Sequence, residues 1–167
     1  MNVEFINPFV EAAVAVFSTM LGCEVQRVGL SLADSNSPEF DITGVIGLSG
    51  KASGDVVISF QNEVAMSATE AMLGETFTQV DDSVVDTVGE LTNMIAGHAK
   101  AALEKYDMRL ALPTVITGTN HSIRFSSKVK PIHIPFECVW GKFSIRVALT
   151  ENEPTGDRSL ATAGASA

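Results

Sequence analysis

Near the N-terminus, apolar residues recur at the spacing of one helix face. The recurring positions are Phe9, Val10, Ala13, Val14, Phe17 and Leu21. Asn7 has a side chain that caps helix N-termini well, and Pro8 suits the first helical position. Gly22 follows the last periodic residue, where glycine commonly ends a helix. The pattern predicts a helix that begins after Asn7 and ends near Leu21.

Three strand-like runs follow this helix. They cover residues 25–32, 41–48 and 54–60. The segments that bound them are rich in turn-forming residues. Asn62 is placed to cap a short helix over 63–73, and Gly74 stands just after it. A longer helical pattern covers about 83–106.

Four β-rich runs complete the patterned part of the chain. They cover residues 114–117, 121–125, 132–139 and 142–149. Trp140-Gly141 separates the last two runs and predicts a hairpin turn. The order of elements favours helices on one side of a mainly antiparallel sheet. We expect an α+β fold, similar to an α/β sandwich, with two long helices and a shorter helix on the sheet.

Length and composition predict a single domain and a short tail. The 167 residues suit one domain. Residues 1–150 carry the apolar periodicity, whereas 151–167 are small and polar. Such a segment buries too little apolar surface to offset the entropy lost on ordering, so we expect the tail to be disordered.

The charge of the chain argues against two classes of partner. Its net charge is −9 at pH 7, and both nucleic acids and anionic membranes attract cationic surfaces. The N-terminal residues include Glu4 but no Lys or Arg, unlike the start of a signal peptide. No apolar run approaches the roughly 18 residues of a membrane span. We expect a cytoplasmic protein that binds neither nucleic acid nor membrane.

The long helix has two distinct faces. An apolar stripe is predicted to be buried and consists of Val84, Val88, Leu91, Ile95, His98 and Ala102. The opposite, polar face consists of Asp86, Glu90, Asn93, Gly97, Lys100 and Glu104. A solvated surface explains most such faces. However, Asn93 is a poor helix former in mid-helix, and Gly97 costs about 1 kcal/mol relative to Ala. A gap beside a carboxylate and an amide suits close approach by another molecule.

The histidines and cysteines do not form a metal motif. His98, His121, His133, Cys23 and Cys138 lack the spacing of metal ligands. His98 falls on the apolar stripe, which favours a hydrogen-bonded core histidine. Cys23 follows a helix C-terminus, where the helix dipole raises a thiol pKa. Cys138 lies in a predicted strand and suits packing. We expect no metal or cofactor of the protein's own.

Several motifs resemble the CheC/CheX/FliY family of chemotaxis phosphatases. The family signature combines an acidic or Ser residue, Glu and Asn, with a later Pro. Here it reads Asp86-x3-Glu90-x2-Asn93, followed by Pro113. Ile6-Asn7-Pro8-Phe9 and the segments 54–60 and 113–118 also resemble the CheX branch. The first helix has Val14 three residues after Glu11, not Asn, so only the second long helix carries a complete centre.

The resemblance implies a phosphatase that hydrolyses the aspartyl phosphate of a CheY-like response regulator. Asn93 would orient the attacking water, and Glu90 would pair with the active-site Lys of the regulator. Asp86 would either attract the partner or solvate the helix, and Gly97 would leave room for docking. Mg²⁺ would come from the regulator, and the phosphatase would be a homodimer. Two alternatives stay open: a non-catalytic receiver-binding module, and a flagellar switch component of the same fold.

Overall fold

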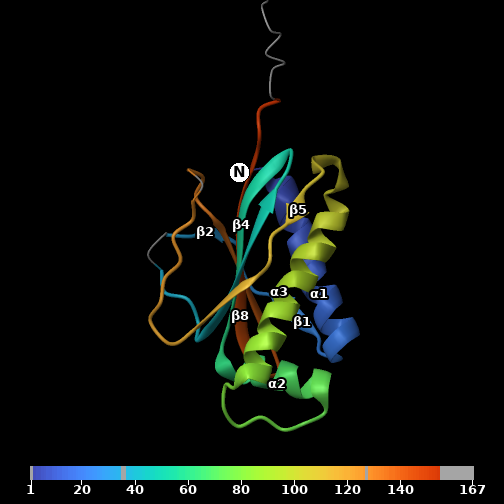
Figure 1. The fold of residues 1–167 in the computed structure, drawn as a ribbon, viewed down its shortest axis with the longest axis vertical. Helices are drawn as coiled ribbons and strands as arrows, with labels where there is room; N and C mark the ends of the chain where they lie inside the picture. The colour runs from blue at the N-terminus through green and yellow to red at the C-terminus, as the bar shows by residue number, and fades with distance from the viewer. Residues whose placement is uncertain (1, 35–36, 127, 155–167) are drawn as a thin grey trace, which may run out of the picture.

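The computed structural model describes residues 2–34, 37–126 and 128–154 (Figure 1). Its helical elements are η1 (Val3–Phe5), α1 (Ile6–Leu21), α2 (Asn62–Leu73), α3 (Asp82–Ala102) and η2 (Glu104–Tyr106). Its strands are β1 (Val25–Arg27), β2 (Ser31–Leu32), β3 (Ile42–Ser49), β4 (Ala52–Phe60), β5 (Arg109–Leu110), β6 (Thr114–Thr117), β7 (Ile132–Cys138) and β8 (Gly141–Glu151).

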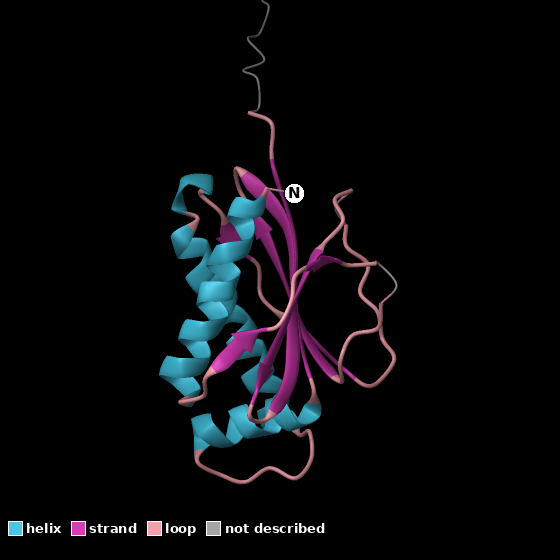
Figure 2. Ribbon diagram, turned by 180° about the vertical axis from the view of Figure 1, so that it is seen from behind, coloured by secondary structure: helices cyan, strands magenta, loops and turns pink. Residues whose placement is uncertain are grey.

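The strands form one antiparallel sheet in the order β1-β7-β8-β4-β3-β5. In addition, β2 pairs with β7, and β6 pairs with β3. Each edge of the sheet is therefore made of two short strands in succession. The three α-helices lie on one face, and long irregular segments lie over the other (Figures 1 and 2). The predicted α+β fold, with two long helices and a shorter one on an antiparallel sheet, is confirmed.

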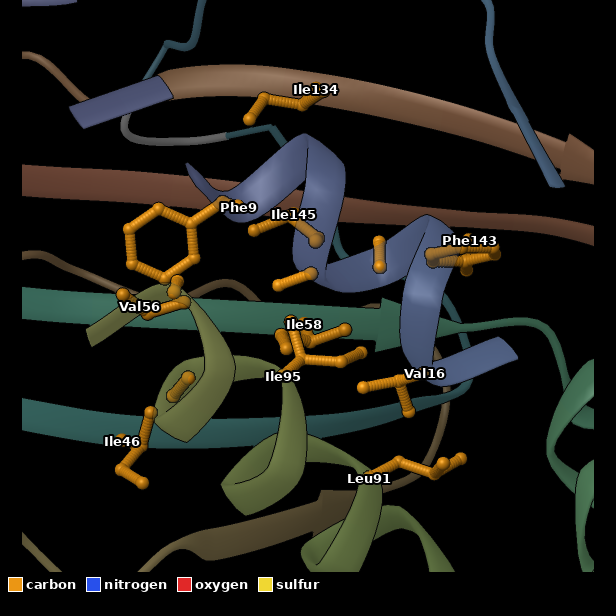
Figure 3. Packing of buried hydrophobic residues seen from close by; sticks show 14 of the residues in the cluster. Phe9, Val16, Ile46, Val56, Ile58, Leu91, Ile95, Ile134, Phe143 and Ile145 are labelled. Carbon is orange, nitrogen blue, oxygen red and sulfur yellow. The ribbon is translucent and has the colours of Figure 1, made fainter. Parts of the chain in front are cut away.

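The core lies between the helices and the sheet. Phe9 and Val16 of α1 and Leu91 and Ile95 of α3 point toward the strands (Figure 3). Alternating residues of β8 meet them from the sheet, and Phe143 among these is fully buried. Side chains that alternate on a strand face opposite sides of the sheet. This burial fixes α1 and α3 on the same face of the sheet.

The start of α1 differs from the prediction. The helix begins at Ile6, and Asn7 is an exposed residue inside it rather than its cap. A 3₁₀ turn precedes the helix, and Asn2 caps that turn by accepting a hydrogen bond from the Glu4 amide at 3.0 Å. At the other end, Gly22 has φ 61°, as predicted for a glycine stop.

The segment Val3–Leu21 is long and apolar enough, by length and composition, to cross a membrane. It therefore contradicts the expectation that no run of this length occurs. In the fold, its residues Phe9, Ala13 and Phe17 are fully buried in the core. The apolar character of this segment is explained by packing against the sheet.

Two predicted β runs and one predicted turn differ from the structure. The run 25–32 is interrupted between β1 and β2, and residues 121–125 form no strand. Instead, the ring of His121 lies 2.8 Å from both Gly118 O and Thr43 Oγ1, which anchors this loop. The β7–β8 turn consists of residues 139 and 140, because Cys138 pairs with Gly141.

The end of the sheet lies slightly beyond the predicted domain boundary. Strand β8 continues to Glu151, and the Tyr106 hydroxyl lies 3.1 Å from its carboxylate. The amide of Asn152 also donates to Lys51 O at 2.7 Å. The remainder of the predicted tail, 155–167, lies outside the described residues.

A buried ion pair lies on the sheet face opposite the helices. Arg146 of β8 places Nη1 2.6 Å from Glu39 Oε1, and the two side chains are only 5% and 1% exposed. Arg146 also donates to Ser37 O at 3.2 Å. The pair attaches the segment around Glu39 to the centre of the sheet. It lies on the opposite face from α3.

Candidate functional site

The candidate site lies on α3, which is held firmly at its N-terminus and against the sheet. Asp81 caps the helix, since its carboxylate accepts a hydrogen bond from the Val84 amide at 3.1 Å. Further along, Thr92 packs over Gly44 of β3. A methyl group on Gly44 would overlap Thr92 Oγ1 and lie 2.9 Å from Thr92 Cβ. Glycine at position 44 therefore lets α3 approach β3 closely.

The predicted site residues lie together on the outer face of α3. Asp86, Glu90 and Asn93 are all exposed. Glu90 and Asn93 are three residues apart in the helix and so are neighbours on its surface. Within the part of the chain that the structure describes, these three side chains make no hydrogen bond or ion pair. Their polar groups are free to bind a partner.

Asn93 has glycines one turn before and one turn after it. Gly89 and Gly97 occupy the neighbouring positions of the same i±4 row. A methyl group on Gly89 would lie 3.5 Å from Val115 Cγ2, and one on Gly97 would lie 3.7 Å from Leu110 Cδ1. Gly97 is half-buried, not fully exposed. The sequence prediction did not use Gly89, although its position four residues before Asn93 was a usable signal.

The predicted position of His98 is wrong. His98 and Ala102 are exposed, whereas Val84, Val88, Leu91 and Ile95 are buried as predicted. The buried stripe continues through Ala99 instead. Because α3 contacts both the sheet and α1, its buried face is set by these neighbours and not by the ideal helical period alone.

The described residues contain no group of three or more His, Cys, Asp or Glu side chains placed to hold a metal ion. Burial, together with the neighbouring Cys138, raises the pKa of the Cys23 thiol to about 11. The direction agrees with the prediction, but burial is the main cause. Cys23 therefore lacks the lowered pKa of a reactive thiol.

The shape of the site favours a macromolecular partner. Glu90 and Asn93 are exposed on a helix and do not line the hollows next to Lys51, Asp55 or Cys138. Small-molecule sites are usually concave and surround most of the ligand. A protruding carboxylate and amide are better suited to enter a cleft of another protein.

The sequence and fold are similar to those of known chemotaxis proteins. The profile of the family described as chemotaxis phosphatase CheX matches residues 42–137. The CheY-P phosphatase CheX of Thermotoga maritima is 27% identical over 127 residues, which are 74% of this chain and 82% of that protein. The crystal structure of a CheC-like superfamily protein from Shewanella sp. PV-4 has a TM-score of 0.83 and 35% identity, covering 90% of this chain and 99% of that one.

A second similar structure contains a partner protein. It is a CheX–CheY–BeF₃–Mg²⁺ complex from Borrelia burgdorferi, with a TM-score of 0.75 and 24% identity. The match covers 90% of this chain and 100% of that chain. At this identity the likeness establishes the fold that the two proteins share.

The fold and these similarities define a protein of the CheC-like superfamily. Within it, the chain belongs to the chemotaxis phosphatase CheX family and is a homologue of a hydrolase.

Proposed function

We propose that this protein hydrolyses the aspartyl phosphate of a CheY-like response regulator, using Asn93 and Glu90. The observation that carries the proposal is the pair itself: an exposed carboxylate and an exposed amide, adjacent on α3 and without partners among the described residues. Membership of the CheX family and the homologous CheY-P phosphatase support the substrate class.

In the proposed reaction, Asn93 enters the active site of the regulator and orients a water molecule. The water oxygen forms a bond to phosphorus, and the bond from phosphorus to the aspartyl oxygen breaks. The aspartate carboxylate leaves with the electron pair, and the water proton passes to the phosphate product or to solvent. Asn has both an acceptor and a donor but cannot take up a proton at pH 7. Its contribution is positioning, which accounts for much of the catalysis in phosphoryl transfer.

Glu90 is proposed to pair with the active-site Lys of the regulator. A carboxylate one turn from Asn93 would fix how deeply the amide reaches. Charge pairs that lose water at an interface contribute specificity, and some contribute several kcal/mol of coupling. Asp86 lies one further turn away and is exposed, so it would add long-range attraction for the same cationic site.

The proposal requires no cofactor bound by this protein. Mg²⁺ would be held by the regulator, in line with the CheX–CheY–BeF₃–Mg²⁺ complex of the Borrelia burgdorferi proteins. With a CheY-like substrate, the protein would act in the cytoplasm.

We further propose a homodimer formed through an edge of the sheet. Along the β1–β2 edge, Val28, Leu30 and Leu32 are 50%, 48% and 64% exposed. An exposed apolar edge is a ready surface for pairing with a second chain. Light scattering should give twice the 17.7 kDa mass of the monomer, and Leu30→Lys should reduce it. A monomeric mass for the wild-type protein at micromolar concentration would refute the dimer.

The lifetime of phosphate on a CheY-like regulator tests the main proposal. Adding this protein in catalytic amounts should shorten the lifetime, with repeated turnovers. Binding without a shorter lifetime would favour the receiver-binding module. Stable incorporation into a flagellar motor complex, again without turnover, would favour the switch component.

A further inference from the structure

The two cysteines of the chain are far apart in the sequence but close together in the fold. Val25 of β1 is directly opposite Cys138 of β7, and residues opposite each other in an antiparallel pair project from the same face of the sheet. Cys23 lies two residues before Val25, and both are buried in the hydrophobic core, against which Cys138 also packs. Cys23 and Cys138 therefore lie on the same side of the sheet, at the start of β1.

The side chains of the two cysteines interact. Burial is the main cause of the raised pKa of Cys23, and Cys138 raises it further through its charge and through a side-chain hydrogen bond. A disulfide needs Cα atoms within about 7 Å of each other and side chains that point together. Cys23 lies between Gly22 and the first residue of β1, so its backbone can adjust without breaking a hydrogen bond of the sheet.

Both cysteines line one hollow at the surface, between the last turn of α1 and the β7–β8 turn. Cys23 is only 4% exposed, whereas Cys138 is half-buried. A small oxidant in the hollow therefore reaches Cys138 more readily. In addition, the thiolate is the reactive form of cysteine, and a thiol with a raised pKa is rarely ionised. Cys138 is thus the first of the two to react, and Cys23 the second.

We infer that Cys23 and Cys138 are a modification site, at which hydrogen peroxide converts the two thiols into a reversible intramolecular disulfide. First, the sulfur of Cys138 forms a bond to one peroxide oxygen and the O–O bond breaks. Cys138 becomes a sulfenic acid, and the departing hydroxide takes the thiol proton to form water. The sulfur of Cys23 then attacks that of Cys138, and the S–O bond breaks. The hydroxide released takes the proton of Cys23, so that the thiols lose two electrons in all and the peroxide is reduced to two water molecules.

The disulfide would fasten an edge of the sheet. Strand β1 has only three residues and pairs with β7 alone, and the bond would hold its start and the end of α1 against β7. A cytoplasm that keeps thiols reduced would reverse the bond, so it would form during exposure to oxidant. The inference concerns α1, β1 and β7 and not the candidate site on α3, so it does not rest on the proposed function.

Oxidation of the reduced full-length protein with hydrogen peroxide tests the inference. After denaturation and alkylation of the remaining thiols, intact mass spectrometry should show a monomer about 2 Da lighter than the reduced protein, without alkyl groups. Digestion should give one pair of peptides joined through Cys23 and Cys138, and dithiothreitol should restore both thiols. The oxidised protein should melt about 10 °C higher, because the bond closes a long loop in the unfolded chain.

The matched control combines Cys138→Ser with Val139→Cys. It keeps two thiols but moves one of them by a single residue, to an 87% exposed position in the β7–β8 turn. This variant should form no intramolecular disulfide under the same conditions. In Cys23→Ser, oxidation of Cys138 should stop at the sulfenic acid, which dimedone traps.

Several results would refute the disulfide site. One is wild-type protein whose two thiols both remain open to alkylation, or whose cysteines join only between two chains. Another is an intramolecular bond that forms as fast in the matched control, because the position of Cys138 would then not matter. An oxidised protein that melts no higher than the reduced one would also refute the site, because the folded structure would not accommodate the bond.

Discussion

The Thr92 side chain packs directly on Gly44, so that no side chain of β3 separates it from the strand at this point. Thr92 Oγ1 donates to Val88 O at 2.7 Å and is buried. Thr92 immediately precedes Asn93. The contact therefore fixes the height and rotation of the helix at the residue next to the candidate amide, which points about 100° away around the helix axis and is exposed.

Gly44→Ala should weaken both stability and activity. The added methyl would overlap Thr92 Oγ1, and overpacking of this kind typically costs about 1–3 kcal/mol. Movement of α3 would also displace Asn93 and lower kcat. Gly89→Ala is the control, because its methyl meets Val115 at an ordinary distance of 3.5 Å. In urea unfolding, Gly89→Ala should be at least as stable as wild type. Equal stability of Gly44→Ala and wild type would contradict the close approach.

Two substitutions of Gly97 should separate its effect on protein stability from its effect on the approach of the partner. Gly97→Ala should raise stability by up to about 1 kcal/mol, because the methyl has room and Ala is the better helix former. Gly97→Gln should keep the fold but slow phosphatase action by filling the space beside Asn93. Melting temperature and regulator-phosphate lifetime measure the two effects. Full activity of Gly97→Gln would mean that the partner does not approach this turn.

Substitutions of Asn93 should impair turnover, whereas substitution of Glu90 should impair binding of the regulator. Asn93→Ala removes the orienting amide, so it should abolish most turnover while binding persists. Asn93→Asp loses the donor and brings a negative charge to the phosphate, so it should be nearly as poor. Glu90→Lys would place a cation against the Lys of the regulator, so binding itself should fail.

Two exposed residues serve as controls for this series. Asn7→Ala changes an exposed Asn of α1, and Glu70→Lys makes the same charge change on α2. Both should keep wild-type kinetics. Wild-type activity of Asn93→Asp would mean that the residue acts as a base, contrary to the positioning mechanism.

Substitutions in the buried ion pair should have strongly non-additive effects on the free energy of unfolding. Arg146→Met leaves the Glu39 carboxylate buried without its partner, which should cost about 3–5 kcal/mol. Adding Glu39→Leu removes the stranded charge and should restore most of the loss. Urea unfolding of the two single variants and the double variant completes the cycle. If Arg146→Met cost less than about 1 kcal/mol, the pair would have to be open to water.

His133 should make the protein less stable in mild acid. Burial, and secondarily the charge of Arg146, lowers the pKa of His133. Below about pH 6.5 the unfolded chain takes up a proton there, and the folded chain resists it until the pH reaches the lowered value. The contribution of His133 to stability is thus present above pH 6.5 and lost as the pH falls. His133→Gln should reduce the loss of stability between pH 7 and pH 5. Parallel pH profiles for His133→Gln and wild type would contradict this.

The sequence alone determined the class of fold and the residues of the candidate site. The helices show a hydrophobic period of 3.6 residues, and turn-forming residues separate the β runs. Both signals are local, so they can be read without knowing which segments of the chain pack together. The spacing of Glu90 and Asn93 is likewise local, because a helix places residues three apart side by side wherever it packs. Their exposure followed from the apolar residues on the opposite face of the same helix.

Tertiary structure decided what depends on neighbours far along the chain. His98 lies at the margin of the apolar stripe, and only the packing of α3 against α1 and the sheet leaves it exposed. Residues 121–125 have strand-like composition, but the bonds of His121 to Gly118 and Thr43 hold them as a loop. Residues 111–113 face only residues 46–47 of β3, and this bulge exists only where two strands pair in a particular register. Such features arise from contacts between distant segments, and local sequence preference does not encode them.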